Sequence, residues 1–254
     1  MGYPDFRLDG QVAIVTGGSS GLGQAGALAL ANAGADVVVA ARRLPECEAV
    51  AEQIRLMGRR ALAVSVDVTD PGSTRALAQA AEEFGPVSIL FNNAGVISPK
   101  SLADTSAEEW RRTLDVSATG TFLCSQAVAP AMSRRGRGAI INMGSILSSV
   151  GMANRVAYAT AKTAVISITR CLAVELGPSG VRVNAIAPTV IVTDLNRKLT
   201  ETQPELYRRV LERMPLGRLG QTDDVTGALV FLASPAASFI TGQTLYVDGG
   251  FTAG

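Results

Sequence analysis

No histidine occurs at any of the 254 positions of this chain. Catalytic triads built on histidine are therefore excluded, and so are the usual histidine-rich catalytic metal sites, because both depend on an imidazole. Acid–base chemistry in this protein has to use another type of side chain. We accordingly expect no metal centre.

Cysteine is scarce as well. The chain has three, Cys47, Cys124 and Cys171, an odd number at wide spacing. This pattern matches neither a disulfide framework nor a zinc site. Reduced cysteines of this kind are typical of the cytosol.

The chain also lacks an excess of charge and any long hydrophobic run. Its formal net charge is +1, which gives no electrostatic reason to expect a nucleic-acid or membrane partner. Residues 1–11 contain no basic segment followed by an apolar one, as a signal peptide would, and apolar runs stay below the roughly 18 residues that span a bilayer. We expect a cytoplasmic protein that acts on a small molecule.

Short β-branched runs alternate with longer stretches that have apolar residues at helical spacing. The expected strands are Val12–Thr16, Asp36–Ala41, Ala61–Val66, Ile89–Asn92, Ala139–Met143, Val181–Ala187 and Thr244–Val247. The expected helices include Gly21–Ala33, Pro45–Met57, Gly72–Phe84 and Tyr158–Leu176. This alternation predicts one α/β domain over residues 1–254, a parallel sheet of about seven strands with helices on both faces.

Residues 193–218 interrupt the alternation. This segment lies between the sixth expected strand and the next expected helix, and it contains Asn196, Pro204 and Pro215. Ligands of open α/β sheets bind beyond the carboxyl ends of the strands, so a long segment leaving such an end is well placed to cover a ligand as a lid. An ordinary surface excursion is the alternative.

A glycine-rich turn follows the first expected strand and runs into a helix. Glycine allows the backbone to turn tightly and to approach a pyrophosphate, which then faces the amino terminus of the helix. The strand–turn–helix context is the one that a dinucleotide site requires. The candidate cofactor contacts in this turn are Gly17, Ser19, Ser20, Gly21, Leu22 and Gly23.

The end of the second expected strand distinguishes the two nicotinamide cofactors. An NAD site places an acid there for the ribose 2′-hydroxyl, whereas this chain has Arg42 and Arg43. Guanidinium groups pair with a 2′-phosphate, so NADP(H) is favoured and NAD stays possible. Asp67 and Val68, at the end of the third strand, are expected beside the adenine, although Asp67 could instead cap the next helix.

Tyr158 and Lys162 lie four residues apart, hence on one face of a helix. A nearby cation favours the phenolate, which lets a tyrosine transfer protons near neutral pH. Ser145 follows the fifth expected strand, at the same sheet edge as the glycine-rich turn, and its hydroxyl could hold a substrate carbonyl oxygen. A helix-surface pair and a turn serine are the alternatives.

Taken together, these motifs resemble those of the short-chain dehydrogenase/reductase family over nearly the whole chain. The matching pieces are Thr16–Gly23, Asn92–Gly95, Ser145, Tyr158 with Lys162, Thr241-Gly242 and Val247–Gly250. The resemblance implies one NAD(P)-binding domain with a Rossmann-type doubly wound sheet. It also implies that Tyr158 is the general acid/base, that Ser145 orients the substrate, and that Lys162 binds the nicotinamide ribose and lowers the pKa of Tyr158.

The resemblance implies further cofactor contacts. Asn92–Gly95 would support the central sheet and border the cofactor, with Asn93, Ala94 and Gly95 as its contacts, and Pro188 would contact it too. Ile191 and Thr193 would contact the carboxamide. The family usually forms homotetramers, with the long helices around 107–133 and 157–176 packing across one dyad; those helix faces could equally be core of a single chain.

The chain departs from the family at two positions. The family usually has asparagine where this chain has Ser117, and that asparagine helps to hold a water molecule in a proton relay. We therefore expect the relay to be rewired, slowed or absent, with activity surviving. The family commonly has glycine where this chain has Thr189, and the Pro-Thr-Val form resembles the sugar and polyol branch, including L-xylulose reductase.

The residues expected around the substrate allow two interpretations. Thr189 and Asn154 could bind a polyhydroxylated substrate, as could Asn196 in the expected lid. An apolar wall is the alternative, with Ile97, Leu147, Val150, Met152, Val190 and Leu195 as its candidates. We count Ser145, Leu147, Asn154, Tyr158 and Thr189 as substrate contacts.

The sequence thus predicts an oxidoreductase that transfers a hydride between NADP(H) and a secondary alcohol or ketone, with a sugar or polyol favoured. A 3-oxoacyl thioester or an apolar cyclic ketone is the first alternative substrate. A cofactor-binding sensor without catalysis is the remote alternative, supported only by Ser117.

Overall fold

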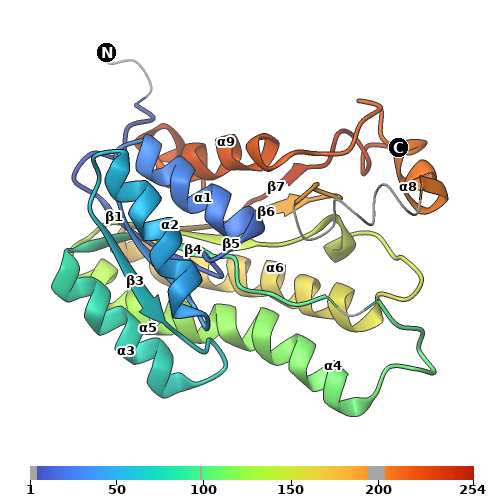
Figure 1. Ribbon diagram of the computed structural model, residues 1–254, viewed down its shortest axis with the longest axis horizontal. Coiled ribbons are helices and arrows are strands. Elements are labelled where there is room, and N and C mark those ends of the chain that lie inside the picture. The colour runs from blue at the N-terminus through green and yellow to red at the C-terminus, as the bar shows by residue number, and fades with distance from the viewer. Residues whose placement is uncertain (1–4, 98, 194–203) are drawn as a thin grey trace.

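The computed structural model describes residues 5–97, 99–193 and 204–254. Seven strands form one parallel sheet in the order β3-β2-β1-β4-β5-β6-β7, with helices on both faces (Figure 1). The predicted fold class is confirmed. Because the strand order reverses between β1 and β4, a crevice opens there at the carboxyl edge of the sheet.

The strands are β1 Val12–Thr16, β2 Asp36–Ala41, β3 Ala61–Ser65, β4 Val87–Asn92, β5 Gly138–Met143, β6 Val181–Pro188 and β7 Thr244–Val247. The helices are α1 Gly21–Asn32, α2 Leu44–Leu56, α3 Pro71–Phe84, α4 Ala107–Leu114, α5 Gly120–Arg134, α6 Val156–Leu176, α8 Pro204–Leu211 and α9 Thr222–Ala233. A single π-turn, Asp115–Thr119, joins α4 to α5. The sequence pattern over 107–133 did not predict this break in the long helix.

Alternate strand residues pack against the two helical layers. Ala13 and Val15 of β1 belong to a core with α1, α2 and α9, whereas Val12 and Ile14 belong to a core with α3, α5 and α6. All five residues of β1 are buried. Burial on both faces explains why the strands read as continuous apolar runs.

The structure adds a helix to the segment between β6 and α9. Residues 194–203, with Asn196, lie outside the described residues, but Pro204–Leu211 form helix α8, which the sequence analysis did not predict. Proline in the first turn, Glu205 and the apolar spacing of Tyr207, Val210 and Leu211 are ordinary signals of a short helix. The prolines and polar residues of the segment obscure that spacing in the sequence.

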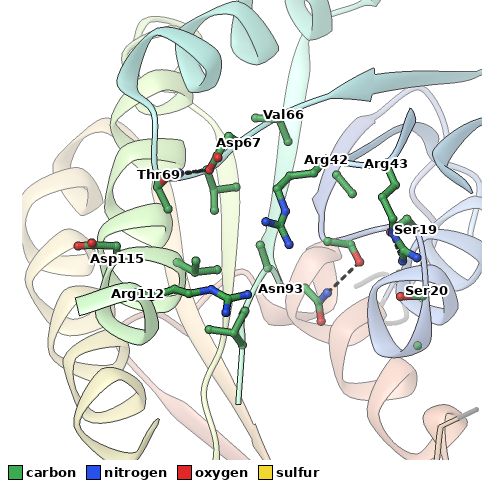
Figure 2. A pocket seen from close by; sticks show the side chains of 18 of the residues that line it. Ser19, Ser20, Arg42, Arg43, Val66, Asp67, Thr69, Asn93, Arg112 and Asp115 are labelled. Carbon is green, nitrogen blue, oxygen red and sulfur yellow. Dashed lines mark hydrogen bonds between the residues drawn. The ribbon is translucent and has the colours of Figure 1, made fainter. Parts of the chain in front are cut away.

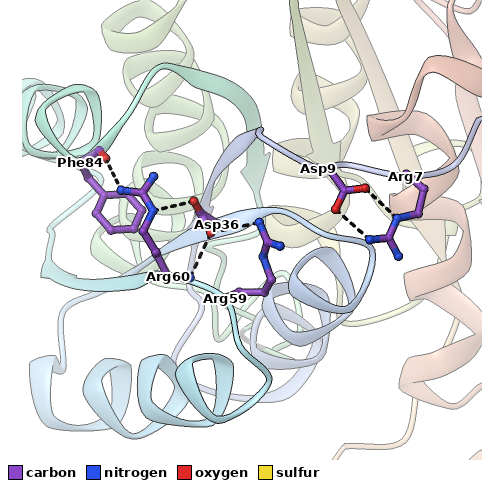
Figure 3. A network of polar contacts seen from close by, with 6 residues as sticks. All are labelled: Arg7, Asp9, Asp36, Arg59, Arg60 and Phe84. Atoms are coloured by element: carbon purple, nitrogen blue, oxygen red, sulfur yellow. Dashed lines mark hydrogen bonds and ion pairs between the residues drawn. The ribbon is translucent and has the colours of Figure 1, made fainter.

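Charged side chains join neighbouring elements at the amino edge of the sheet, opposite the crevice (Figure 3). Asp36, at the start of β2, accepts hydrogen bonds from the backbone amide and Nε of Arg60 at 3.0 and 2.8 Å. The Arg60 guanidinium lies 4.6 Å from the centre of the Phe84 ring. These contacts join β2 to α3 and leave the carboxyl edge free for chemistry.

Candidate active site

The glycine-rich turn has the geometry of a phosphate-binding loop. Gly17 and Gly21 have φ angles of 65° and 56°, a region that favours glycine. A Cβ on Gly23 would stand 2.1 Å from the Gly17 oxygen, so only glycine fits there. Ser20 precedes α1 without a side-chain cap, which leaves the amide groups of the first helical turn available to an anion.

Asn93 braces this turn from the end of β4. Its Nδ2 donates to the backbone oxygens of Thr16 and Gly17 at 3.2 and 3.3 Å. In return, the Thr16 hydroxyl accepts from the amides of Asn93 and Ala94 at 3.1 and 3.2 Å. The neighbouring ends of β1 and β4 are therefore fixed to each other across the crevice.

A cleft of about 1150 Å³ runs along this edge (Figure 2). Many of the predicted cofactor contacts line this cleft. They are Gly17, Ser19, Ser20, Gly21, Leu22, Arg42, Arg43, Asp67, Val68, Asn93, Ala94, Gly95 and Thr193. Gly23, Tyr158, Lys162, Pro188 and Ile191 are not among its lining residues. Pro188 ends β6, and the buried Ile191 pairs with Gly220 in an isolated bridge.

Two arginines stand at the end of β2, on the wall of the cleft. Arg43 pairs with Glu46 at 3.2 Å and donates to the Ser19 hydroxyl at 3.4 Å. Arg42 has no carboxylate within ion-pair distance among the described residues. Its exposed guanidinium therefore remains available to an anionic ligand.

Asp67 follows β3, in the lining of the same cleft as Arg42, and does not cap the following helix. Its carboxylate accepts from the amide and hydroxyl of Thr69 at 2.9 and 2.7 Å, and these bonds hold the pKa of Asp67 below its usual value. Asp70 is the cap of α3, accepting from the amides of Gly72 and Ser73. The alternative role considered for Asp67 is thus taken by its neighbour, and Asp67 shapes the turn beside the cleft.

Lys162 is the buried cation of the site. Its side chain is 3% exposed, and its Nζ donates to the Met143 oxygen at 2.6 Å, from the end of β5. Burial lowers its pKa to about 8. The Nζ also lies 5.7 Å from the centre of the Tyr158 ring, one helical turn away.

Tyr158 lies one helical turn before Lys162 on α6. Burial raises the pKa of its phenol, while the hydroxyl of Ser145 and the charge of Arg155 act in the opposite direction. Ser145 begins a short 3-10 turn after β5, and its oxygen accepts from the Leu147 amide at 3.2 Å. The structure therefore brings Ser145, Tyr158 and Lys162 together at one sheet edge.

Ser117 lies in the π-turn, fully buried, and its hydroxyl has no hydrogen-bond partner among the described residues. A Cβ on Gly95 would stand 3.6 Å from the Ser117 oxygen and 3.5 Å from the Lys162 Nζ. The absent side chain of Gly95 therefore leaves a space that both polar groups face. An unsatisfied buried hydroxyl beside a buried ammonium suits an ordered water molecule.

A buried chain of amides holds α6 against the sheet; the resemblance implies a supporting role for Asn92, but no motif indicates Asn142 or Thr169. Asn92 Nδ2 donates to Asn142 Oδ1 at 2.9 Å, and Asn142 Nδ2 donates to the Thr169 hydroxyl at 2.9 Å. A signal was present at Asn142, because this asparagine interrupts the apolar strand β5. These bonds link β4, β5 and the helix that carries Tyr158.

The other expected substrate contacts lie in different surroundings. Leu147 is buried in a cluster with Ile146, Met214 and Phe251, against which Tyr158 packs. Thr189 lines a separate cavity of about 500 Å³ beside β7, and its hydroxyl is buried without a partner among the described residues. Asn154 is exposed and has a φ of 61°.

Comparison with known proteins agrees with this geometry. Residues 17–252 match the family model described as enoyl-(acyl carrier protein) reductase. The cis-4-hydroxycyclohexanecarboxylate dehydrogenase of Sinomonas cyclohexanicum is 43% identical over 96% of this chain and 97% of its own. The chain belongs to the short-chain dehydrogenase/reductase family.

Two further relatives are similar to this chain over nearly their whole length. The D-threitol dehydrogenase of Mycolicibacterium smegmatis is 40% identical over 98% of this chain and 95% of its own. The structure of a gluconate 5-dehydrogenase from Burkholderia cenocepacia, in complex with NADP and tartrate, superposes with a TM-score of 0.95 at 36% identity, covering 99% and 98% of the two chains. This short-chain dehydrogenase/reductase is therefore an oxidoreductase that binds a nicotinamide cofactor and acts on alcohol groups.

Within residues 5–97, 99–193 and 204–254, no group of three or more acidic or cysteine side chains could hold a metal ion. None of the helices in those ranges is long and apolar enough to cross a membrane.

Proposed function

We propose that this enzyme transfers a hydride between NADP(H) and a secondary alcohol or ketone of the sugar and polyol type. The observation that carries the proposal is the convergence of Ser145, Tyr158 and Lys162 at the sheet edge that also carries the dinucleotide cleft. Hydride chemistry and proton transfer then meet at one place.

The residues of the cleft fit a dinucleotide. The positive φ angles at Gly17 and Gly21 and the crowding at Gly23 shape a turn whose uncapped amides receive a pyrophosphate. Arg42, with no carboxylate partner among the described residues, would bind a 2′-phosphate. The NADP bound in the related gluconate 5-dehydrogenase supports this choice.

The bound nicotinamide supplies or accepts the hydride. Ser145 holds the substrate oxygen, where charge develops, and Tyr158 gives or removes the proton of that oxygen. Lys162 places a positive charge beside the Tyr158 ring and, in the complex, binds the nicotinamide ribose. Ser117 faces Lys162 across Gly95 and supports a water-mediated supply of protons.

The proposed substrate class is that of polyhydroxylated alcohols and ketones. The relationship to D-threitol and gluconate dehydrogenases supports it. A second candidate, an alicyclic alcohol, is favoured by the apolar cluster of Ile146, Leu147, Met214 and Phe251 beside Tyr158. The relationship to a hydroxycyclohexanecarboxylate dehydrogenase agrees with that candidate.

A substrate panel tests the proposal. Purified enzyme is assayed by nicotinamide absorbance with alditols, ketoses, alicyclic alcohols, diketones and 3-oxoacyl thioesters, each with NADP and with NAD. We expect turnover of an alditol or ketose with NADP preferred, and Arg42→Asp should lower the ratio of NADPH to NADH efficiency. Turnover confined to thioesters would refute the substrate class. An unchanged cofactor ratio would remove Arg42 from the site.

We also propose a reducing, cytoplasmic location and a homo-oligomer. All three cysteines are unpaired, and Cys47 and Cys124 are buried, which is consistent with a reducing compartment. Phe122 of α5 and Val174 of α6 are exposed apolar residues, as an interface between those helices would need. Light scattering after gel filtration tests the oligomer; a monomer at micromolar concentration would refute it.

A further inference from the structure

One face of α4 forms a wall of the dinucleotide cleft. Five residues of this helix and of the π-turn after it line the cleft, at the spacing of a single helical face. They are Glu108, Arg111, Arg112, Asp115 and Val116. Four of the five are charged, and none is among the cofactor contacts that the sequence predicts. This wall of the cleft therefore has no assigned ligand.

Arg112 extends into the cleft rather than along its own helix. Glu108 and Asp115 lie four residues before it and three residues after it, the spacings at which helical ion pairs form. No ion pair joins Arg112 to a carboxylate among the described residues, although Lys100 does pair with Glu109 of the same helix. Figure 2 shows the Arg112 side chain directed toward Asn93, while the Asp115 carboxylate points to the other side. The guanidinium thus faces the space that a ligand would fill.

The surroundings of Arg112 suit the flat base of a nucleotide. Arg42 extends into the same cleft from the end of β2 (Figure 2). Val68 and Val116 add apolar surface to the lining. No aromatic side chain is found among the described residues that line the cleft. Guanidinium planes bind the faces of aromatic rings, so the two arginines are the groups that can stack on a purine there.

The position of Arg112 also separates the base from the phosphates. The phosphate-binding features gather at the glycine-rich turn, where Arg43 donates to the Ser19 hydroxyl at 3.4 Å. Arg112 comes from α4 instead, one helical turn before Val116. Val68, beside which the sequence places the adenine, lines the same cleft. A contact with the base therefore fits Arg112 better than a contact with a phosphate.

We propose that the Arg112 guanidinium stacks on the adenine of the bound cofactor, on the face opposite Arg42. The inference rests on the proposed function, because it concerns the same nicotinamide cofactor. Arg112 then contributes to the affinity for NADP(H) and for NAD(H) alike, whereas Arg42 distinguishes the two through the 2′-phosphate. Loss of Arg112 weakens the binding of the dinucleotide and leaves the proton transfer at Tyr158 intact.

The first experiment measures the affinity of both reduced cofactors by fluorescence titration. Arg112→Ala should raise the Kd of NADPH and of NADH by a similar factor, about 3- to 30-fold, as expected for the loss of one cation–π contact. A loss confined to NADPH would mean that Arg112 binds the 2′-phosphate, and it would overturn the inference. Unchanged Kd values for both cofactors would overturn it as well.

The second experiment uses the two halves of the cofactor as displacers of bound NADPH. Adenosine 5′-monophosphate carries the adenine, and nicotinamide mononucleotide carries the other base. Arg112→Ala should raise the inhibition constant of the adenosine compound by about the factor found for NADH and leave that of the nicotinamide compound unchanged. Equal losses for the two halves would show a general disturbance of the cleft and would overturn the inference.

Two variants control these measurements. Arg112→Lys keeps the charge without the planar face, so it should recover only part of the NADH affinity; full recovery would contradict stacking. Arg75→Ala removes an exposed arginine of α3 that does not line the cleft, and it should bind both cofactors normally. A wild-type enzyme that binds neither cofactor would refute the proposed function. Normal binding and turnover in wild type, with the same Kd values in Arg112→Ala, would refute the stacking alone.

Discussion

Replacing Lys162 by methionine should make the protein more stable while it destroys the site. The side chain is 3% exposed, and burial lowers its pKa from 10.5 to about 8. Near neutral pH the lysine is charged in both the folded and the unfolded chain. The folded state then carries the full cost of burying that charge, which methionine, of similar length and volume, avoids.

The magnitude follows from the pKa. One pKa unit corresponds to about 1.4 kcal/mol, so the shift destabilises the folded apoprotein by about 3 kcal/mol at pH 7. Methionine leaves the Met143 oxygen without its 2.6 Å donor, which costs about 1 kcal/mol. We expect a net gain of about 2 kcal/mol, or about 4–8 °C in Tm for a chain of this size.

The pH dependence identifies the cause. A lysine with a depressed folded pKa destabilises fully below that pKa, and the penalty disappears as pH rises from about 8 to 10.5. Thermal or urea unfolding of apo wild type and Lys162→Met, at one protein concentration, should show a difference that shrinks over this range. A variant that is less stable at pH 7, or a difference independent of pH, would refute the reasoning.

Two further substitutions test the turn and the relay. Gly23→Ala puts a Cβ 2.1 Å from the Gly17 oxygen and should weaken NADPH binding at least about tenfold in a fluorescence titration. The control Gly227→Ala in α9, where nothing lies within 4 Å of the added Cβ, should bind NADPH normally. Equal NADPH affinity in the two variants would contradict the role of the turn. Ser117→Asn should raise kcat without changing NADPH affinity, because a longer amide can reach water beside Lys162; an unchanged kcat would show that proton supply is not limiting.

Most of the fold could be predicted from the sequence, because the strands are buried on both faces and therefore appear as apolar runs. Val12–Thr16 and Thr244–Val247 have the expected ends, whereas the fourth strand begins at Val87, two residues before the expected start. Local sequence signals did not predict the features whose conformation depends on tertiary contacts. The π-turn at Asp115–Thr119 depends on packing rather than on helix propensity.

The candidate site was predictable to a similar extent. Motif residues at the ends of strands necessarily meet at one edge of a parallel sheet, so Ser145 and the glycine-rich turn could be placed together from the sequence. The space between Ser117 and Lys162 could not, because only the fold shows that both side chains face the missing side chain of Gly95. Thr189 likewise lines a cavity beside β7 that no motif indicates.

The most direct test of the central claim is the activity of Tyr158→Phe. The phenol is the group that we assign to proton transfer, and phenylalanine keeps the ring against Leu147 and Phe251. The variant should bind NADPH as wild type does, while kcat/KM for the best alcohol of the panel falls by at least about a hundredfold. Retained turnover at the wild-type rate would contradict the assignment.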